Sequence, residues 1–368
     1  MSFANIFEAA KEGTVEDVKY FVEKKGISAK AKDDDGWTPL HHAARNNSNV
    51  EVLKYLVSRG ADVNAKSNSG RTPLHAAAQE NTNIEAFKFL VSNGSDVNAR
   101  NNDGDTPLYD AARFCSNVEV LKYLVSRGAD VNAENNDSAT PLHFAAANDN
   151  IGFVKFLVAA LADIDVKDKY GFTPLHGTAR NKNTDIAQIL VSKGADVNAK
   201  ADVGFTPLNM AVNEGNAKVA QFLISARADT NDRGPKGMPL LSFAVVKNNT
   251  DIVKLLVSTG ADVNEKDNEG NGVPPLISAI ANGNIDIVKL LISAGADVNM
   301  KLDDAASILH FAVVKTIKEK RTMDIIKLLV SAGADVKKKG ETGSTPFSLA
   351  KTFGGAEINE YFSSIGAK

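Results

Sequence analysis

The sequence predicts an all-α solenoid of about eleven helix-turn-helix repeats with projecting hairpin-like loops. Two recurring signatures predict this fold. The tripeptide Thr-Pro-Leu returns every 33 or 34 residues, and Gly-Ala-Asp-Val-Asn returns in phase with it. One pair of short amphipathic helices cannot bury its apolar face alone, so successive copies must stack into a continuous core. The clear copies of the tripeptide contain Pro39, Pro73, Pro107, Pro141, Pro174 and Pro207.

Degenerate copies extend the pattern along the rest of the chain, which predicts one continuous domain over residues 1–368. Residues 1–34 and 338–368 are expected to be capping repeats on either side of the central repeats 35–337, and such caps indicate a complete array. The degenerate copies of the tripeptide lie at Pro239, Pro275, Ile308 and Pro346. The second signature begins at Gly60, Gly128, Gly194, Gly260 and Gly295, with a close variant at Gly94.

Residues 172–197 illustrate why one repeat forms two helices. Thr173 is a good N-cap because its hydroxyl can accept a free backbone N–H, and Pro174 suits the first turn, where no N–H is needed. A second helix is indicated by Ile186 and Leu190, which lie one turn apart. Gly194 ends it, because glycine adopts the left-handed conformation without a steric penalty.

Irregular repeats are expected near residues 227–322. The glycine that ends a second helix is replaced by Leu161 and by Arg227, and the loop over residues 232–238 is shorter than its counterparts. A non-glycine residue in a left-handed position costs about 1 kcal/mol. An insertion near residues 316–322 fits either a solvated helix extension or a surface that attracts an acidic partner. Its basic residues are Lys315, Lys318, Lys320 and Arg321.

The repeated unit resembles the ankyrin repeat. The residues that carry the resemblance are Gly-Trp-Thr-Pro-Leu-His at residues 36–41, the later Thr-Pro-Leu-His copies, and Gly-Ala-Asp-Val-Asn-Ala at residues 60–65. The resemblance covers essentially the whole chain. It implies antiparallel helix pairs stacked into a curved ankyrin-repeat solenoid. It also implies a concave face of loop tips and first helices that binds another protein.

Composition excludes several classes of function. The 368 residues carry a net charge of -3, which argues against a nucleic-acid partner. No apolar run is long enough for a membrane span, and the N-terminus has no secretory pattern. The single cysteine excludes an internal disulfide. These features predict a cytoplasmic protein, and a capped solenoid is expected to be a monomer.

The use of histidine argues against an enzyme. Repeats lie about 10 Å apart, so histidines that occur once per repeat cannot share a metal ion, and each is expected to bond adjacent backbone. Cys115 has no histidine near it in the sequence that could activate it. The sequence therefore predicts no catalytic residue, no metal and no cofactor. The histidines in the shared position are His41, His75, His143, His176 and His310.

Positions that the repeat fold leaves free predict a partner-binding stripe on the loop tips and first helices. Aromatic residues and arginine are the types that most often dominate binding energy. For Trp37 and Phe172, packing within the chain is an equally good interpretation, and Phe114 is expected to pack into the stack. The predicted contact residues are Trp37, Arg45, Arg71, Asp103, Asp105, Arg113, Tyr170, Phe172, Arg180 and Phe205.

Two alternatives to a scaffold that binds partner proteins remain open at this stage. The irregular region 227–275 could serve a sensor of small molecules or anions, although no glycine-rich cradle is evident there. Ankyrin-like arrays also occur as effectors delivered by host-associated bacteria, which would require export without a classical signal peptide. Fold alone does not identify a partner.

Overall fold

Each copy of the Thr-Pro-Leu signature lies at the start of a helix in the computed structural model, which describes residues 3–234, 237–267, 272–300, 306–319 and 323–367. The described residues are all-α, apart from one isolated bridge between Arg233 and Pro239. The chain divides into two compact units, Met1–Ala201 and Asp202–Lys368, here called the N-terminal and C-terminal units. The single continuous domain and the count of eleven repeats stay predictions.

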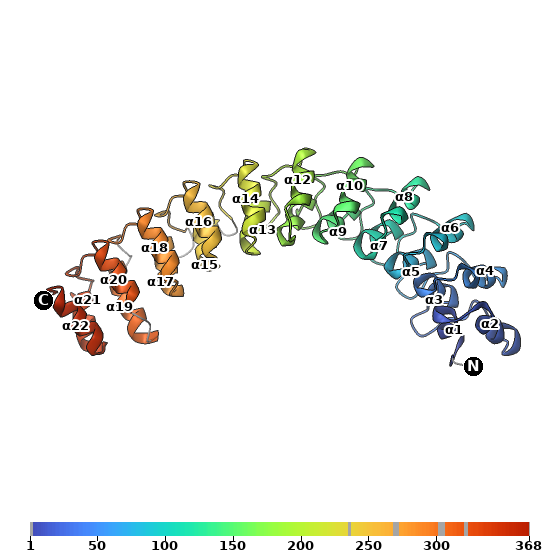
Figure 1. Ribbon diagram of the computed structural model, residues 1–368, viewed down its shortest axis with the longest axis horizontal. Coiled ribbons are helices and arrows are strands. Elements are labelled where there is room, and N and C mark those ends of the chain that lie inside the picture. Colours follow the sequence, from blue (N-terminus) through green and yellow to red (C-terminus); the bar gives the residue numbers. More distant parts are fainter. Residues whose placement is uncertain (1–2, 235–236, 268–271, 301–305, 320–322, 368) are drawn as a thin grey trace. The chain divides into compact units, whose positions relative to one another are not determined.

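The N-terminal unit consists of two rows of helices (Figure 1). First helices pack on first helices of the next repeat, and second helices pack on second helices. The first helices are α1 (Ile6–Glu12), α3 (Pro39–Asn46), α5 (Pro73–Glu80), α7 (Pro107–Phe114), α9 (Pro141–Ala147) and α11 (Pro174–Gly177), which continues as the 3₁₀ helix η2 (Thr178–Arg180). The second helices are α2 (Val15–Lys19) with the π-helix η1 (Tyr20–Lys24), α4 (Val50–Ser58), α6 (Ile84–Ser92), α8 (Val118–Ser126), α10 (Ile151–Ala159) and α12 (Asp185–Ser192).

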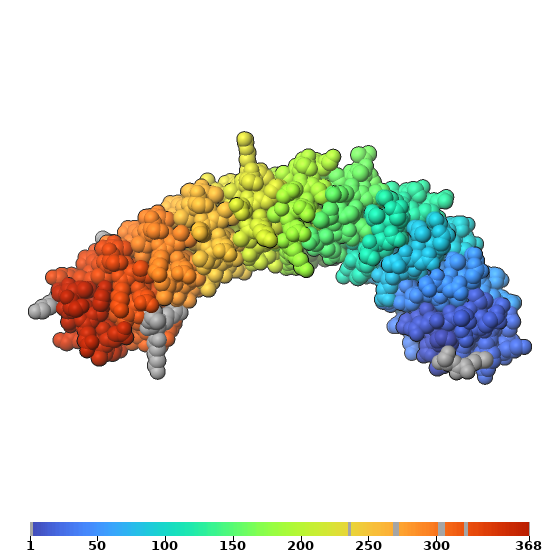
Figure 2. All heavy atoms as spheres, viewed as in Figure 1, coloured from blue at the N-terminus to red at the C-terminus, as the bar shows by residue number. Residues whose placement is uncertain are grey.

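The C-terminal unit repeats the same two-row arrangement. Its successive repeats form a continuous packed surface in the space-filling view (Figure 2). The first helices are α13 (Pro207–Asn213), α15 (Leu240–Val246), α17 (Pro275–Asn282), α19 (Ile308–Glu319) and α21 (Pro346–Phe353). The second helices are α14 (Ala217–Ser225), α16 (Thr250–Ser258), α18 (Ile285–Ser293), α20 (Asp324–Ser331) and α22 (Ala356–Ser364).

The Thr-Pro pair starts the first helices as the sequence predicts. Thr173 is the N-cap of α11 and Pro174 its first residue, and the same pairing recurs in α3, α5, α7, α9, α13 and α21. The copy at Pro239 is shifted by one residue, because Pro239 itself is the N-cap and α15 begins at Leu240. Proline has no hydroxyl, so this helix begins without a side-chain cap.

The second signature joins one repeat to the next. Asp62 accepts a hydrogen bond from the backbone N–H of Asn64 at 2.9 Å, which closes a turn of the kind that aspartate favours. The amide of Asn64 then donates to the Gly94 carbonyl at 2.8 Å and accepts from the Asp96 N–H at 2.9 Å. The recurring asparagine is therefore a bridge between repeats, a role that the sequence pattern alone did not assign.

The irregular positions behave largely as expected. Leu161 and Arg227 both adopt the left-handed conformation, with φ of 65° and 68°, where other repeats have glycine. Helix α19 runs on to Glu319, so Lys318 belongs to a helix extension, whereas Lys315 lies within the ordinary length of a first helix. Lys320 and Arg321 lie outside the described residues. None of the helices in the described ranges is both long and apolar enough to span a bilayer.

The strain at Leu161 predicts a stabilising substitution. Leu161→Gly should raise the free energy of unfolding by about 1 kcal/mol, because glycine adopts this conformation without a Cβ clash. The leucine side chain is 84% exposed, so little buried contact is lost. Urea denaturation of the purified protein measures the change. Leu161→Ala is the matched control and should give little gain, since alanine keeps the Cβ; an equal gain from both variants would contradict the explanation.

Candidate functional site

In four first helices, a histidine at the third position contacts both the hairpin before it and the hairpin of the next repeat. His75 Nδ1 lies 3.2 Å from the Thr72 backbone N–H, and His75 Nε2 lies 3.0 Å from the Asp105 carbonyl. A backbone N–H only donates and a carbonyl only accepts, so the ring is neutral with its proton on Nε2. His41, His143 and His310 make the same two contacts. This confirms the structural role predicted for the recurring histidines.

Burial sets the protonation of these rings. It lowers the pKa of His41 and of His75 to about 4, and it also lowers the pKa of His143. Burial raises the pKa of the Cys115 thiol, whereas a nucleophilic cysteine needs a lowered pKa. Within the described ranges, no three His, Cys, Asp or Glu side chains converge as a metal site requires.

Trp37 combines packing within the chain with an open edge. Its ring centroid lies 5.5 Å from that of His41 and 5.4 Å from that of His42. The Arg45 guanidinium lies 5.5 Å from the indole centroid, and Glu80 pairs with the same guanidinium. Trp37 is nevertheless only half-buried. The structure therefore brings together two of the predicted contact residues, Trp37 and Arg45.

Arg71 is held inside the N-terminal unit rather than being free at its surface. Its Nη1 lies 2.7 Å from Asp110 Oδ2, and the two side chains are 15% and 0% exposed. Burial raises the pKa of Asp110 to about 7, although Arg71 acts to lower it. Among the described residues, Asp110 Oδ1 has no hydrogen-bond partner. Removing the guanidinium would leave a buried carboxylate uncompensated, so Arg71 has a structural role.

The two predicted aspartates of the next hairpin, Asp103 and Asp105, differ in exposure. Asp103 is exposed at the loop tip. Asp105 is 4% exposed, because Asn101 and Asn135 both donate to its carboxylate, the latter at 3.0 Å. Here the structure differs from the surface position expected from the sequence. Asp105 cannot present its carboxylate to a partner in this conformation.

Arg113 is exposed and held between two aromatic rings. Its guanidinium lies 4.9 Å from the ring centroid of Phe114 and 5.3 Å from that of Phe144. The Phe144 ring in turn lies 4.8 Å from that of Tyr109. Phe114 is 47% exposed, so the expectation that it packs into the stack is wrong. It ends α7, where its ring can stack on arginine instead of entering the core.

The remaining predicted residues lie on the following hairpins. Tyr170 is 55% exposed at a loop tip, with Lys169 Nζ 4.9 Å from its ring centroid. Phe172 is half-buried, edge-on to His176 at 5.4 Å between centroids. Arg180 is exposed at the end of η2. Phe205 belongs to the C-terminal unit, where it is half-buried with its ring centroid 6.2 Å from that of Phe243.

Sequence reasoning missed Asp110 and Phe144. Both are the fourth residue of a first helix, directly after the recurring histidine position. The fourth residues of α3, α5, α7 and α9 are His42, Ala76, Asp110 and Phe144. Such variety beside the nearly constant Thr-Pro-Leu-His is a signal that could have found them, because the repeat fold itself does not dictate this position.

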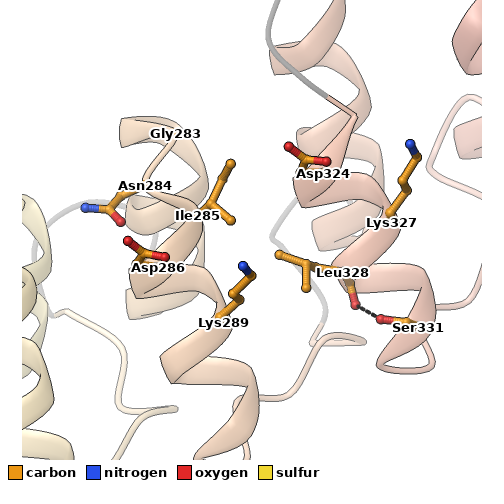
Figure 3. A pocket seen from close by; sticks show the side chains of 9 residues that line it. All are labelled: Gly283, Asn284, Ile285, Asp286, Lys289, Asp324, Lys327, Leu328 and Ser331. Carbon is orange, nitrogen blue, oxygen red and sulfur yellow. Dashed lines mark hydrogen bonds between the residues drawn. The ribbon is translucent and has the colours of Figure 1, made fainter.

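Two features outside this face are explained by the scaffold. In the irregular region, Arg233 pairs with Glu265 and donates to the Gly237 carbonyl at 3.0 Å, so this cation is already engaged. A groove of about 850 Å³ lies between the second helices α18 and α20 (Figure 3). Both helices present an aspartate and a lysine one turn apart on it, the spacing that forms exposed pairs such as Glu51–Lys54 on α4. Opposite charges alternate there and do not converge on one ligand.

The family model for ankyrin repeats matches residues 6–67, 64–135, 128–201, 198–267 and 241–340. The chain belongs to the ankyrin-repeat family. Ankyrin repeats generally serve as protein–protein interaction modules, and the family is typically non-catalytic. A comparison with curated proteins found no match.

The neutral histidine bridge predicts a dependence of stability on pH. A histidine with a pKa of about 4 when folded and 6.5 when unfolded loses its stabilising contribution as pH falls from 6.5 towards 4. For His75 the loss between pH 7.5 and pH 5 should be about 2 kcal/mol. His75→Asn should lower stability at pH 7.5 and should remove this pH dependence, since asparagine does not titrate.

The chain supplies a model for that variant. Asn209 occupies the same position in α13, where its Oδ1 lies 3.3 Å from the Thr206 N–H. Urea denaturation of wild type and His75→Asn at several pH values gives the difference in their free energies of unfolding. The titration of Asp110 affects both proteins equally and cancels from this difference. A stability difference that is constant from pH 7.5 to pH 5 would rule out the depressed pKa.

Proposed function

We propose that this ankyrin-repeat protein is a non-catalytic, monomeric scaffold that works in the cytoplasm. It binds a partner protein through the first helices and hairpin tips of the N-terminal unit. The family supports a protein partner, and the net charge of -3 argues against nucleic acid. Cys115 is buried and free, and burial raises the pKa of its thiol, which fits a protein in a reducing compartment.

The observation that carries the proposal is the exposure of Arg113 and its stacking between two aromatic rings. Arg113 is exposed, and among the described residues no ion pair is recorded for it, whereas Arg45 and Arg71 are paired with Glu80 and Asp110. Stacking between two rings reduces the conformational freedom that arginine loses on binding. A rigid, hydrated guanidinium with free N–H groups is suited to a partner carboxylate or carbonyl.

Neighbouring positions on the same face supply the apolar part of an interface. Phe114 and Tyr170 are about half exposed, and Trp37 and Phe172 are half-buried. Aromatic side chains around arginine are the usual composition of residues that dominate binding. We therefore keep Trp37, Arg45, Asp103, Arg113, Tyr170, Phe172 and Arg180 in the proposed contact set, and we leave out the internally engaged Arg71 and Asp105.

A triple variant tests the surface. Trp37→Ala, Arg113→Ala and Phe172→Ala together should abolish capture of a stoichiometric partner, because they remove the stacked cation and two aromatic contacts. Quantitative affinity capture with mass spectrometry, from a lysate of the source organism, compares wild type and variant. Circular dichroism and the melting temperature establish that the variant is folded.

The second-helix face offers a matched control. Arg127 lies 5.2 Å from the ring centroid of Tyr123, much as Arg113 lies on Phe114, but on the other row of helices. Tyr55→Ala, Tyr123→Ala and Arg127→Ala together should leave capture unchanged. Partners retained equally by both triple variants, or no stoichiometric partner at all, would refute the proposed surface.

A further inference from the structure

A hollow of about 370 Å³ lies in the C-terminal unit, between helix α19 and the hairpin that precedes α21. Phe311 and Val314 of α19 and Leu349 of α21 form its apolar walls. Pockets for small ligands have volumes of about 300–1,000 Å³ and mostly apolar walls with a few polar groups. The hollow has the size and the wall chemistry of a site for a small molecule.

The hollow exists because two hairpins lack the large side chain that other hairpins carry. The Ser307 N–H lies 3.1 Å from His310 Nδ1, just as the Thr38 N–H lies 3.1 Å from His41 Nδ1. Ala306 therefore occupies the position that Trp37 occupies two residues before α3. In the next hairpin, the same position before the capping threonine holds Ser344. Both of these small residues line the hollow.

Gly340 leaves further space in the same place. It lies five residues before the capping threonine, where Asp33 and Asp168 close their hairpins by accepting a backbone N–H. Its φ lies outside the left-handed region, so the backbone does not require glycine here. A Cβ added to Gly340 would meet no atom closer than 3.8 Å, apart from its neighbours in the chain. The missing side chain therefore leaves room that nothing else fills.

The chain itself shows which shape fits such a position. The Trp37 ring centroid lies 5.5 Å from that of His41 and 5.4 Å from that of His42, the third and fourth residues of α3. The third and fourth residues of α19 are His310 and Phe311, and both line the hollow. Aromatic rings pair favourably at centroid distances of about 4.5–7 Å. A planar ring that entered the hollow would find the aromatic surface that an indole covers in α3.

The polar groups of the hollow favour a ligand that donates a hydrogen bond. His310 Nε2 lies 3.0 Å from the Ser344 carbonyl and its Nδ1 lies 3.1 Å from the Ser307 N–H, so neither ring nitrogen is left for a ligand. Thr342 Oγ1 and Ser344 Oγ lie 2.9 Å apart and bond each other. Glu341 is exposed, and an ionised carboxylate only accepts.

We propose that this hollow binds a free planar aromatic molecule of about the size of indole, with an N–H donor on its edge. The ring takes the place of the missing Trp37-like side chain, and the N–H bonds the Glu341 carboxylate. Ala306 and Ser344 bound the hollow on two hairpins, so it encloses one ring system instead of extending along the helices as a peptide groove would. The inference goes beyond the proposed function and does not depend on Arg113.

Titrations with three small probes test the site and the chemistry of its ligand. Saturation-transfer difference NMR on the full-length protein gives Kd for indole, 1-methylindole and cyclohexylmethanol. Indole should bind with a Kd below about 1 mM, a reasonable limit for a ligand of so few atoms. 1-Methylindole lacks the N–H and cyclohexylmethanol lacks the planar ring. Each should bind at least about threefold more weakly than indole.

Variants establish where indole binds. Ser344→Phe should raise the Kd at least about tenfold, because the new ring fills the hollow as Phe205 fills the equivalent position. Val203→Phe is the matched control, since it adds the same ring to an exposed hairpin position of the same unit and should leave Kd within about twofold. Glu341→Gln should remove most of the difference between indole and 1-methylindole. Phe311→Ala removes a wall and tests the hollow if Ser344→Phe fails to fold.

Four outcomes would overturn the proposal. Absence of indole binding at 10 mM would show that the hollow is not a ligand site, and a Kd unchanged by both Ser344→Phe and Phe311→Ala would place binding elsewhere. Equal Kd values for indole and cyclohexylmethanol would contradict an aromatic ligand. N-acetyltryptophanamide that bound at least about tenfold more tightly than indole would identify the occupant as a tryptophan of another protein. None of these results bears on the triple variant of the N-terminal face.

Discussion

The hydrogen bond from a first-helix histidine to the next hairpin is the interaction on which the N-terminal unit depends. His41 and His75 use one ring nitrogen to cap their own helix and the other to hold the carbonyl of the following repeat. The bond determines where the next hairpin begins and therefore where the next first helix packs. Because each repeat contacts only its neighbours, a local bond of this kind controls how one repeat of the N-terminal unit packs on the next.

The bridge is absent over part of the C-terminal unit. The third residues of α13, α15 and α17 are Asn209, Ser242 and Ile277. Asn209 Nδ2 and Ser242 Oγ are buried and have no hydrogen-bond partner among the described residues. A buried polar atom without a partner costs about 1–3 kcal/mol. Helices α13, α15 and α17 therefore lack the histidine contact that joins α3 and α5 to the hairpin of the next repeat.

Much of the fold could be predicted from the sequence, because the same helix-start and helix-end residues recur in repeat after repeat. Thr173, Pro174 and Leu161 take the conformations that their residue types require. The pairing of Arg71 with Asp110 could not be predicted in this way. The two residues are 39 positions apart, and their contact depends on the angle at which a hairpin crosses the next first helix. The register shift at Pro239 was missed for a related reason, since Leu240 can occupy the position of the usual proline.

The candidate site was predictable only in outline. Residue type alone placed Asp105 and Arg71 on the surface beside Arg113. In the structure the three side chains have different partners. Carboxamides bind Asp105, a carboxylate binds Arg71, and two aromatic rings contact Arg113. Position within the helix is the better guide. The repeat motif does not dictate the fourth and seventh residues of the first helices, so their chemistry varies from one repeat to the next.

An apolar contact lies beside the missing bridge at Asn209. Phe205 and Phe243 pack together there, so this contact could compensate for the lost hydrogen bond. Compensation would bury the rings, however, and Phe243 stays half-buried while Val246 is 48% exposed. The contact between Phe205 and Phe243 therefore replaces only part of what the histidine bridge supplies to α3 and α5.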